Sequence, residues 1–106
     1  MMSDPSRIDI IVNGDETCKL MLVMTEHRKW DEDPNMAKQF FEKARTYLGW
    51  VQSEGFRKEH PGIETKNVVI ELACKHEPSE EVITLMGRMN EATEGKSGVR
   101  FRYRTA

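Results

Sequence analysis

The sequence predicts an α+β fold, a two-layer sandwich in which two helices cover one face of a four-stranded mixed sheet. Three observations predict this class. Four segments alternate apolar and polar residues as strands do, two have the three- and four-residue apolar spacing of helices, and the chain order is ββαβαβ. A chain of 106 residues has room for one core, so we expect a single domain over residues 1–106, with residues 1–6 as a flexible tail.

The first two strands are expected over residues 7–13 and 18–25. In the first, the alternation assigns the even-numbered residues to the core side and Ile11 to the other side. The second is apolar on both sides. The Asn13-Gly14 pair between them is typical of a turn, so the two strands are predicted to form an antiparallel hairpin.

A helix is predicted over residues 34–54. Asp33 can cap it, and Pro34 suits its first turn because proline has no N–H to leave unpaired. Apolar residues then recur at helical spacing up to Val51, and the polar positions between them, Lys43 included, are assigned to the solvent side.

The rest of the chain supplies one more helix and two more strands. A long connection over residues 56–66 leads to an apolar strand over residues 67–76. Ser79 is a capping residue for a helix that ends near Ala92. The last strand, residues 99–104, alternates apolar residues with arginines.

Right-handed crossovers predict the sheet order 1-2-3-4, with the first strand antiparallel to the others and the arginine strand at an edge. Cys18 then begins the second strand and Cys74 ends the third, at opposite ends of the sheet. A disulfide needs Cα atoms within about 7 Å, so two free, buried thiols are expected.

Three stretches resemble a small bacterial family of unknown function: residues 8–11, 23–30 and 67–78. The distinctive part is an acid-His-x-x-Trp segment after the second strand, here Glu26, His27 and Trp30. The resemblance implies a bacterial cytoplasmic protein without an assigned activity, and it supplies no catalytic residues.

Polar side chains gather where the two parallel inner strands end, which is where open α/β sheets usually bind ligands. The candidate polar site consists of His27, Trp30, Asp31, His76 and Glu77. Imidazole and carboxylate groups could hold a divalent metal through His27, His76 and Asp31, or one histidine could act as a general base. The alternative, which we favour, is that the acids cap helices, the histidines are ordinary loop residues and Trp30 anchors the loop. No cofactor is expected.

The uncovered sheet face is more apolar than a solvated face should be, and such surfaces usually meet a partner. The interface candidates are Ile11, Met21, Val23, Trp50, Val69 and Ala73. Trp50 lies opposite the apolar side of its helix, so it either marks an interface or is covered by the connection that follows. The arginines of the last strand are expected to pair with Glu71 on the neighbouring strand.

The formal charge of −2, with both signs interspersed, argues against a nucleic-acid partner. The first residues have no basic and apolar leader, and no apolar run is long enough for a spanning helix. A cytoplasmic location and no membrane partner are therefore expected. The leading hypothesis is a non-enzymatic interaction protein that forms a homodimer through its open sheet face, and the alternative is a metal-binding protein or metal-dependent enzyme that uses His27 and His76.

Overall fold

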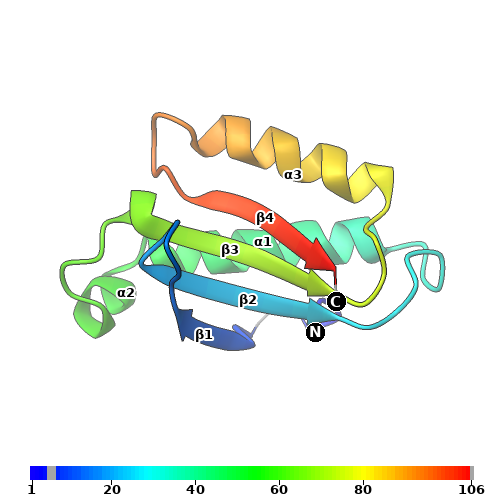
Figure 1. Ribbon diagram of the computed structural model, residues 1–106, viewed down its shortest axis with the longest axis horizontal. Helices are drawn as coiled ribbons and strands as arrows, with labels where there is room; N and C mark the ends of the chain where they lie inside the picture. Colours follow the sequence, from blue (N-terminus) through cyan, green and yellow to red (C-terminus); the bar gives the residue numbers. More distant parts are fainter. Residues whose placement is uncertain (5–6, 106) are drawn as a thin grey trace.

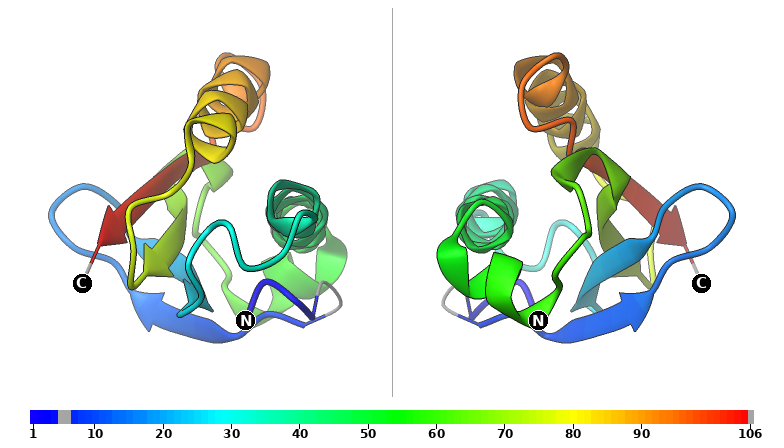
Figure 2. Two further views of the ribbon diagram at one scale, coloured as in Figure 1. Left: turned by 90° about the vertical axis from the view of Figure 1, so that its right-hand side faces the viewer. Right: turned by 90° about the vertical axis from the view of Figure 1, so that its left-hand side faces the viewer.

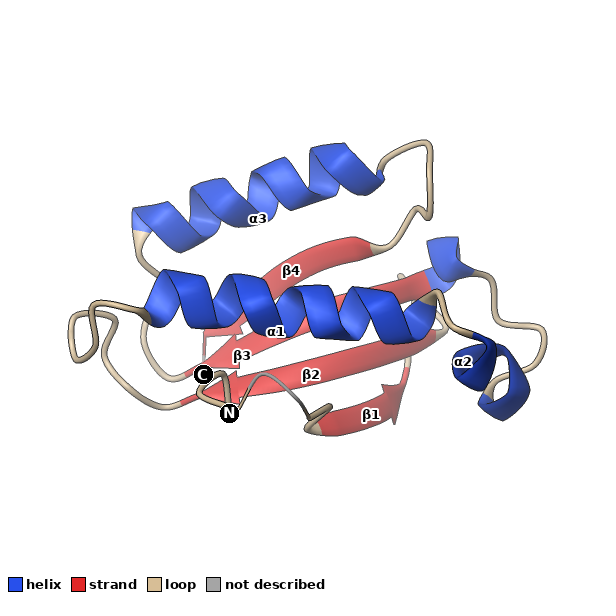
Figure 3. Ribbon diagram, turned by 180° about the vertical axis from the view of Figure 1, so that it is seen from behind, coloured by secondary structure: helices blue, strands red, loops and turns tan. Residues whose placement is uncertain are grey.

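Four strands form one mixed sheet in the order β1-β2-β3-β4, as the sequence predicts. The computed structural model describes residues 1–4 and 7–105. Its elements are β1 (Ile10–Asn13), β2 (Leu20–Glu26), α1 (Met36–Val51), α2 (Glu54–Glu59), the 3-10 turn η1 (Thr65–Asn67), β3 (Val68–Cys74), α3 (Glu80–Thr93) and β4 (Arg100–Thr105). β1 is antiparallel to β2, and β2, β3 and β4 are parallel (Figure 1). The two long helices, α1 and α3, lie on the same side of the sheet (Figure 3).

The strand register decides which residues face the helices. Leu22, Ile70 and Phe101 lie opposite one another across the three parallel strands, and all three are buried beneath the helices. Ile11 pairs with Leu22 and therefore also points to the helix side. The prediction that Ile11 lies on the open face is wrong, because successive strand residues alternate sides and the hairpin register sets their phase. Ile10 and Val12 lie on the open face instead.

The turn between β1 and β2 explains this register. Gly14 donates its backbone N–H to the carbonyl of Lys19 at 3.0 Å. A side chain at position 14 would place its Cβ 2.0 Å from the carbonyl oxygen of Cys18, so only glycine fits here. The Asn13-Gly14 turn signal is thus explained by a close approach of two backbone segments.

β1 is exposed on both of its faces. The exposed fractions of Ile10, Ile11 and Val12 are 43%, 41% and 38%. In Figure 2, β1 lies at the end of the sheet away from α3, beyond the part that the helices cover. The strand begins at Ile10 rather than Arg7, so it is also shorter than predicted.

The buried side of α1 differs from the predicted one. Lys43 and Tyr47 are completely buried, whereas the sequence pattern assigns Lys43 to solvent. The Lys43 Nζ donates to the carbonyls of Met1 and Asp4 and, at 2.8 Å, to the carboxylate of Asp9. These three acceptors compensate the ammonium group for the water that it loses on burial, which explains how Lys43 can be buried.

The chain before β1 is what covers Lys43. Met2 is completely buried in the core, and residues 1–4 lie against α1, where the sequence predicts a flexible tail over residues 1–6. Residues 5 and 6 lie outside the described part. Asp9 also donates its backbone N–H to the Tyr47 hydroxyl at 2.9 Å, and burial raises the pKa of Tyr47 to about 12.

The connection after α1 folds back on that helix. α1 ends at Val51, three residues before the predicted end, and Ser53 caps the short helix α2 by accepting a hydrogen bond from Phe56. The Trp50 ring meets the Phe56 ring edge-on at 5.0 Å between centroids, and the His60 ring lies 5.9 Å from it. Trp50 is half-buried against the connection that follows its helix, which is one of the two alternatives that the sequence left open.

The helix α3 closes the outer edge of β4. Its predicted cap is confirmed: the Ser79 hydroxyl accepts from Val82. Near its other end, the Asn90 side chain accepts from the backbone N–H of Phe101 at 2.7 Å and donates to its carbonyl at 2.9 Å. The Thr93 hydroxyl donates to the carbonyl of Val99 at 2.6 Å. The side chains of α3 thus occupy backbone groups that a further strand would need.

Candidate functional site

The carboxyl ends of β2 and β3 lie side by side, as the topology predicts (Figure 1). The side chains of His27 and Asp31 are exposed there, and His76 is half-buried. Trp30 packs against the core and donates its indole N–H to the carbonyl of His76 at 3.0 Å. The predicted anchoring role of Trp30 is therefore what the structure shows, and its polar contact is with the backbone of His76.

Glu77 has a structural role at this edge. Its carboxylate accepts hydrogen bonds from the hydroxyls of Tyr103 at 2.7 Å and Thr105 at 3.1 Å. The bond to Glu77 raises the pKa of Tyr103. Glu77 therefore fixes the end of β4 beside β3.

The proposed metal ligands are not assembled into a site. Within residues 1–4 and 7–105, no group of three or more His, Cys, Asp or Glu side chains is arranged to hold a metal ion. Stable metal sites in proteins use three or four protein ligands. His27, His76 and Asp31 therefore lack the arrangement that the metal hypothesis needs.

A buried ion pair that the sequence analysis missed lies at the same edge. Glu26 is 1% exposed, and Arg28 binds its carboxylate through two guanidinium nitrogens at 2.6 and 3.1 Å. Arg28 also donates to Gln39 of α1 at 2.7 Å and lies 3.5 Å from Asp33. Burial raises the pKa of Glu26, but the hydrogen bonds from Arg28 outweigh it and hold the pKa below its ordinary value.

This ion pair gives a physical reason for the acid-His-x-x-Trp segment. Glu26 continues the alternation of Leu20, Leu22 and Met24 toward the helix side, so the sequence did contain a signal that it is buried. A buried carboxylate needs a partner, and Arg28 supplies it two residues later. Together with Trp30, this pair holds the β2–α1 loop against the sheet end.

The open face carries the ion pairs that the sequence predicts. Glu71 is buried, and its carboxylate accepts from Arg102 at 2.9 Å and from Arg104 at 2.6 Å. Arg102 reaches on to Asp15 in the β1–β2 turn at 3.0 Å. Hydrogen bonds from Thr17 and from Arg102 lower the pKa of Asp15. The turn and β4 are thus tied together across the sheet.

These ion pairs cover the middle of the open face. Val23 and Val69 are only 5% and 1% exposed, and Met21 and Ala73 are half-buried. The apolar stem of an arginine can shield such side chains while its guanidinium reaches an acid. Four of the predicted interface residues are therefore covered at least in part by the chain itself.

Replacing Glu71 with glutamine will lower the free energy of unfolding by about 1.5–3 kcal/mol, the usual contribution of a hydrogen bond to a charged group. The glutamine amide keeps one acceptor oxygen but removes the negative charge and the second acceptor that the two arginines share. Urea denaturation measures the change. The matched control is Glu64→Gln, because Glu64 forms an exposed pair with Lys66 and should change stability by less than about 1 kcal/mol. Equal effects of the two substitutions would contradict this role for Glu71.

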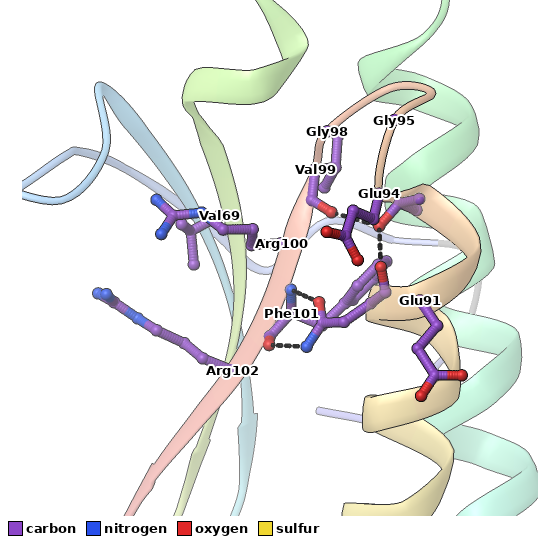
Figure 4. Close-up of a pocket in the computed structure, with 11 residues that line it drawn as sticks. Val69, Glu91, Glu94, Gly95, Gly98, Val99, Arg100, Phe101 and Arg102 are labelled. Atoms are coloured by element: carbon purple, nitrogen blue, oxygen red, sulfur yellow. Dashed lines mark hydrogen bonds between the residues drawn. The ribbon is translucent and has the colours of Figure 1, made fainter.

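A cavity of about 490 Å³ lies where α3 meets the start of β4. Figure 4 shows Glu91 and Glu94 on its helix side, whereas Arg100 and Arg102 extend away on the other side of β4. The amide of Asn90 and the hydroxyl of Thr93 line it but already bind the backbone of β4. The cavity therefore brings together no set of groups with an evident chemical role.

The fold and its polar clusters define an α+β sandwich in which the two buried acids, Glu26 and Glu71, are bound by arginines and the buried Lys43 is bound by Asp9. The chain belongs to DUF6572, a family of unknown function, whose model matches residues 1–106. No curated protein and no solved structure matches the chain significantly. No helix in the described part of the chain is long and apolar enough to cross a membrane.

Proposed function

We propose that this protein is a non-enzymatic protein-interaction module that self-associates through an apolar surface centred on β1. The observation that carries the proposal is the exposure of Ile10, Ile11 and Val12, three successive large apolar side chains that the chain leaves uncovered. Ile10 and Val12 lie on the open face and Ile11 on the helix side, so this edge strand exposes apolar side chains on both of its faces, and such exposed groups usually meet a partner.

The distribution of exposed apolar side chains supports this location. In the described residues, the large apolar side chains that stay exposed are Met1, Ile10, Ile11, Val12 and Ile83. Ile83 stands alone on α3, whereas three of the five are consecutive in β1. The sequence predicts an interface in the middle of the open face, but Val23 and Val69 are covered there. We therefore place the proposed interface at the border of the sheet, on β1.

The polar clusters support a role that does not involve catalysis. Glu26, Glu71 and Glu77 each accept hydrogen bonds from side chains that fix a loop or a strand end. A general base must reach a substrate, and these carboxylates are occupied within the fold.

The wild-type protein is expected to form a dimer whose fraction rises with concentration, and Val12→Lys should shift it toward monomer because a charge would be buried in the interface. Native mass spectrometry and sedimentation equilibrium measure this. Ile83→Lys is the matched control, since Ile83 has the same 38% exposure on a different element. A wild-type protein that stays monomeric at every concentration would overturn the proposal, as would an equal effect of the two substitutions.

A further inference from the structure

We propose, building on the self-association above, that two copies join β1 to β1 in antiparallel register about Ile11. The two four-stranded sheets then become one continuous sheet of eight strands. The partner is a second copy of this chain, and the contact is made by backbone hydrogen bonds as well as by apolar side chains.

The two edge strands of the sheet, β1 and β4, differ in whether other parts of the chain cover their outer backbone groups. The backbone of Phe101 and the carbonyl of Val99, at the β4 edge, are occupied by Asn90 and Thr93, and the strand itself carries three arginines. Proteins commonly block edge strands by such means. β1 pairs with β2 on one side only, and its four residues include no charge and no proline.

This difference selects a closed dimer. Pairing β1 of one copy with β4 of the next would leave new edges and build an open filament, but the β4 edge is blocked. Pairing β1 with β1 places the same strand on both sides of a two-fold axis. The contact uses the outer edge of β1 in both copies and stops at two copies, and Tyr47 bounds that edge because its hydroxyl accepts the outward N–H of Asp9.

The hydrogen-bond pattern shows which residues point outward. The N–H of Gly14 bonds toward β2, and alternate residues of a strand direct their backbone groups to the same side. Ile10 and Val12 therefore bond toward β2, whereas the N–H and C=O groups of Ile11 point away from it. An antiparallel pair centred on Ile11 lets the two copies of Ile11 exchange both bonds.

Charge favours this register over the neighbouring one. When Ile11 opposes Ile11, Arg7 lies four residues from the axis on one copy and Asp15 four residues from it on the other. Arg7 is exposed and has no ion pair within the described residues, and the Asp15 side chain, which binds Arg102 at 3.0 Å, is still 47% exposed. A register centred on Val12 would instead place Arg7 opposite Thr17 and lose this pairing of opposite charges.

Cysteine cross-linking tests the arrangement. In a background with Cys18→Ser and Cys74→Ser, Ile11→Cys should shift from monomer to covalent dimer on mild oxidation. Hydrogen-bonded antiparallel partners have Cα atoms about 5.5 Å apart, within the range of a disulfide. The matched control is Val12→Cys, which is exposed to a similar extent but opposes Ile10 and should cross-link far less. Circular dichroism first checks that this background folds. If it does not, a background with Cys18→Ala and Cys74→Ala is used in its place.

The outcomes separate this inference from the proposed function. Cross-linking of Val12→Cys without Ile11→Cys would mean that the open faces pack against each other, because Ile11 points to the helix side. That result overturns edge pairing and keeps self-association. A dimer that neither cysteine links also overturns edge pairing, and a protein that is monomeric before oxidation overturns both. A second, independent experiment uses Ile11→Lys. The proposed register places the two lysines opposite each other at the two-fold axis, so the dissociation constant of the dimer should rise at least about tenfold.

Discussion

Replacing Lys43 with methionine will lower the free energy of unfolding by about 3 kcal/mol, the lower end of the range for breaking a buried ion pair. Methionine preserves the volume and the apolar stem but leaves the Asp9 carboxylate and the carbonyls of Met1 and Asp4 without their shared donor. The lower end applies because the Asp9 side chain is 16% exposed and can reach water. Urea denaturation followed by circular dichroism measures the loss.

The control lies on the same helix. Lys38 has a side chain that is 73% exposed and lies 4.0 Å from Glu42, so Lys38→Met should change stability by less than about 1 kcal/mol. Hydrogen exchange should also show that Lys43→Met loosens residues 1–4 first. A variant as stable as the wild type would contradict the view that Lys43 fastens this segment to α1.

Replacing Arg28 with methionine will cost about 3–5 kcal/mol at neutral pH, because Glu26 remains buried and loses the guanidinium that compensates its charge. The backbone N–H of Arg28, which also binds Glu26, is retained in the variant. Arg45→Met is the control, since Arg45 is exposed and its guanidinium lies over the Phe41 ring, 5.6 Å from the ring centroid.

The pH dependence of this loss has a definite sign. In the wild type the Glu26 pKa is lowered, so its stabilisation is present above the ordinary glutamate pKa and disappears as pH falls through the folded value. Without Arg28, burial raises the Glu26 pKa, so the variant destabilises as pH rises and recovers on acidification. The difference in unfolding free energy should therefore be larger at pH 7 than near about pH 4, close to the ordinary glutamate pKa. A pH-independent difference would show that Glu26 stays neutral or solvated.

The topology could be predicted because it depends on patterns that a single sequence carries. Alternation located the strands, and helical spacing with Ser79 as a cap located α3. Right-handed crossovers with both helices on one face then left one simple strand order, which the structure confirms. The two cysteines are free and buried, as that order required.

The errors in the fold prediction have a common physical cause. Ile11 was assigned to the wrong face because side-chain direction in β1 depends on hairpin register, which the Gly14–Lys19 contact sets. Lys43 was assigned to solvent because helical spacing cannot show that a distant segment will supply oxygen atoms for its ammonium group. Both depend on contacts between parts of the chain that a local pattern does not contain.

The candidate site was predicted only in part. The sheet edge and the anchoring role of Trp30 followed from topology and residue type. Glu26 and Arg28 were missed, although continuing the alternation of β2 by one step would have buried Glu26. The exposure of the β1 side chains could not be predicted, because it depends on whether a helix lies over this edge of the sheet.

The chain order of α3 and β4 has a consequence for how the sheet is completed during synthesis. Asn90 and Thr93 precede the strand that they cover, since α3 comes before β4 in the chain. When β4 pairs with β3 it meets a helix that already holds the covering groups, so its outer edge is occupied as soon as it forms. A nascent chain is most prone to aggregate while strand edges are unpaired. In this protein that edge is therefore unpaired only until β4 itself has been made and has docked beside β3.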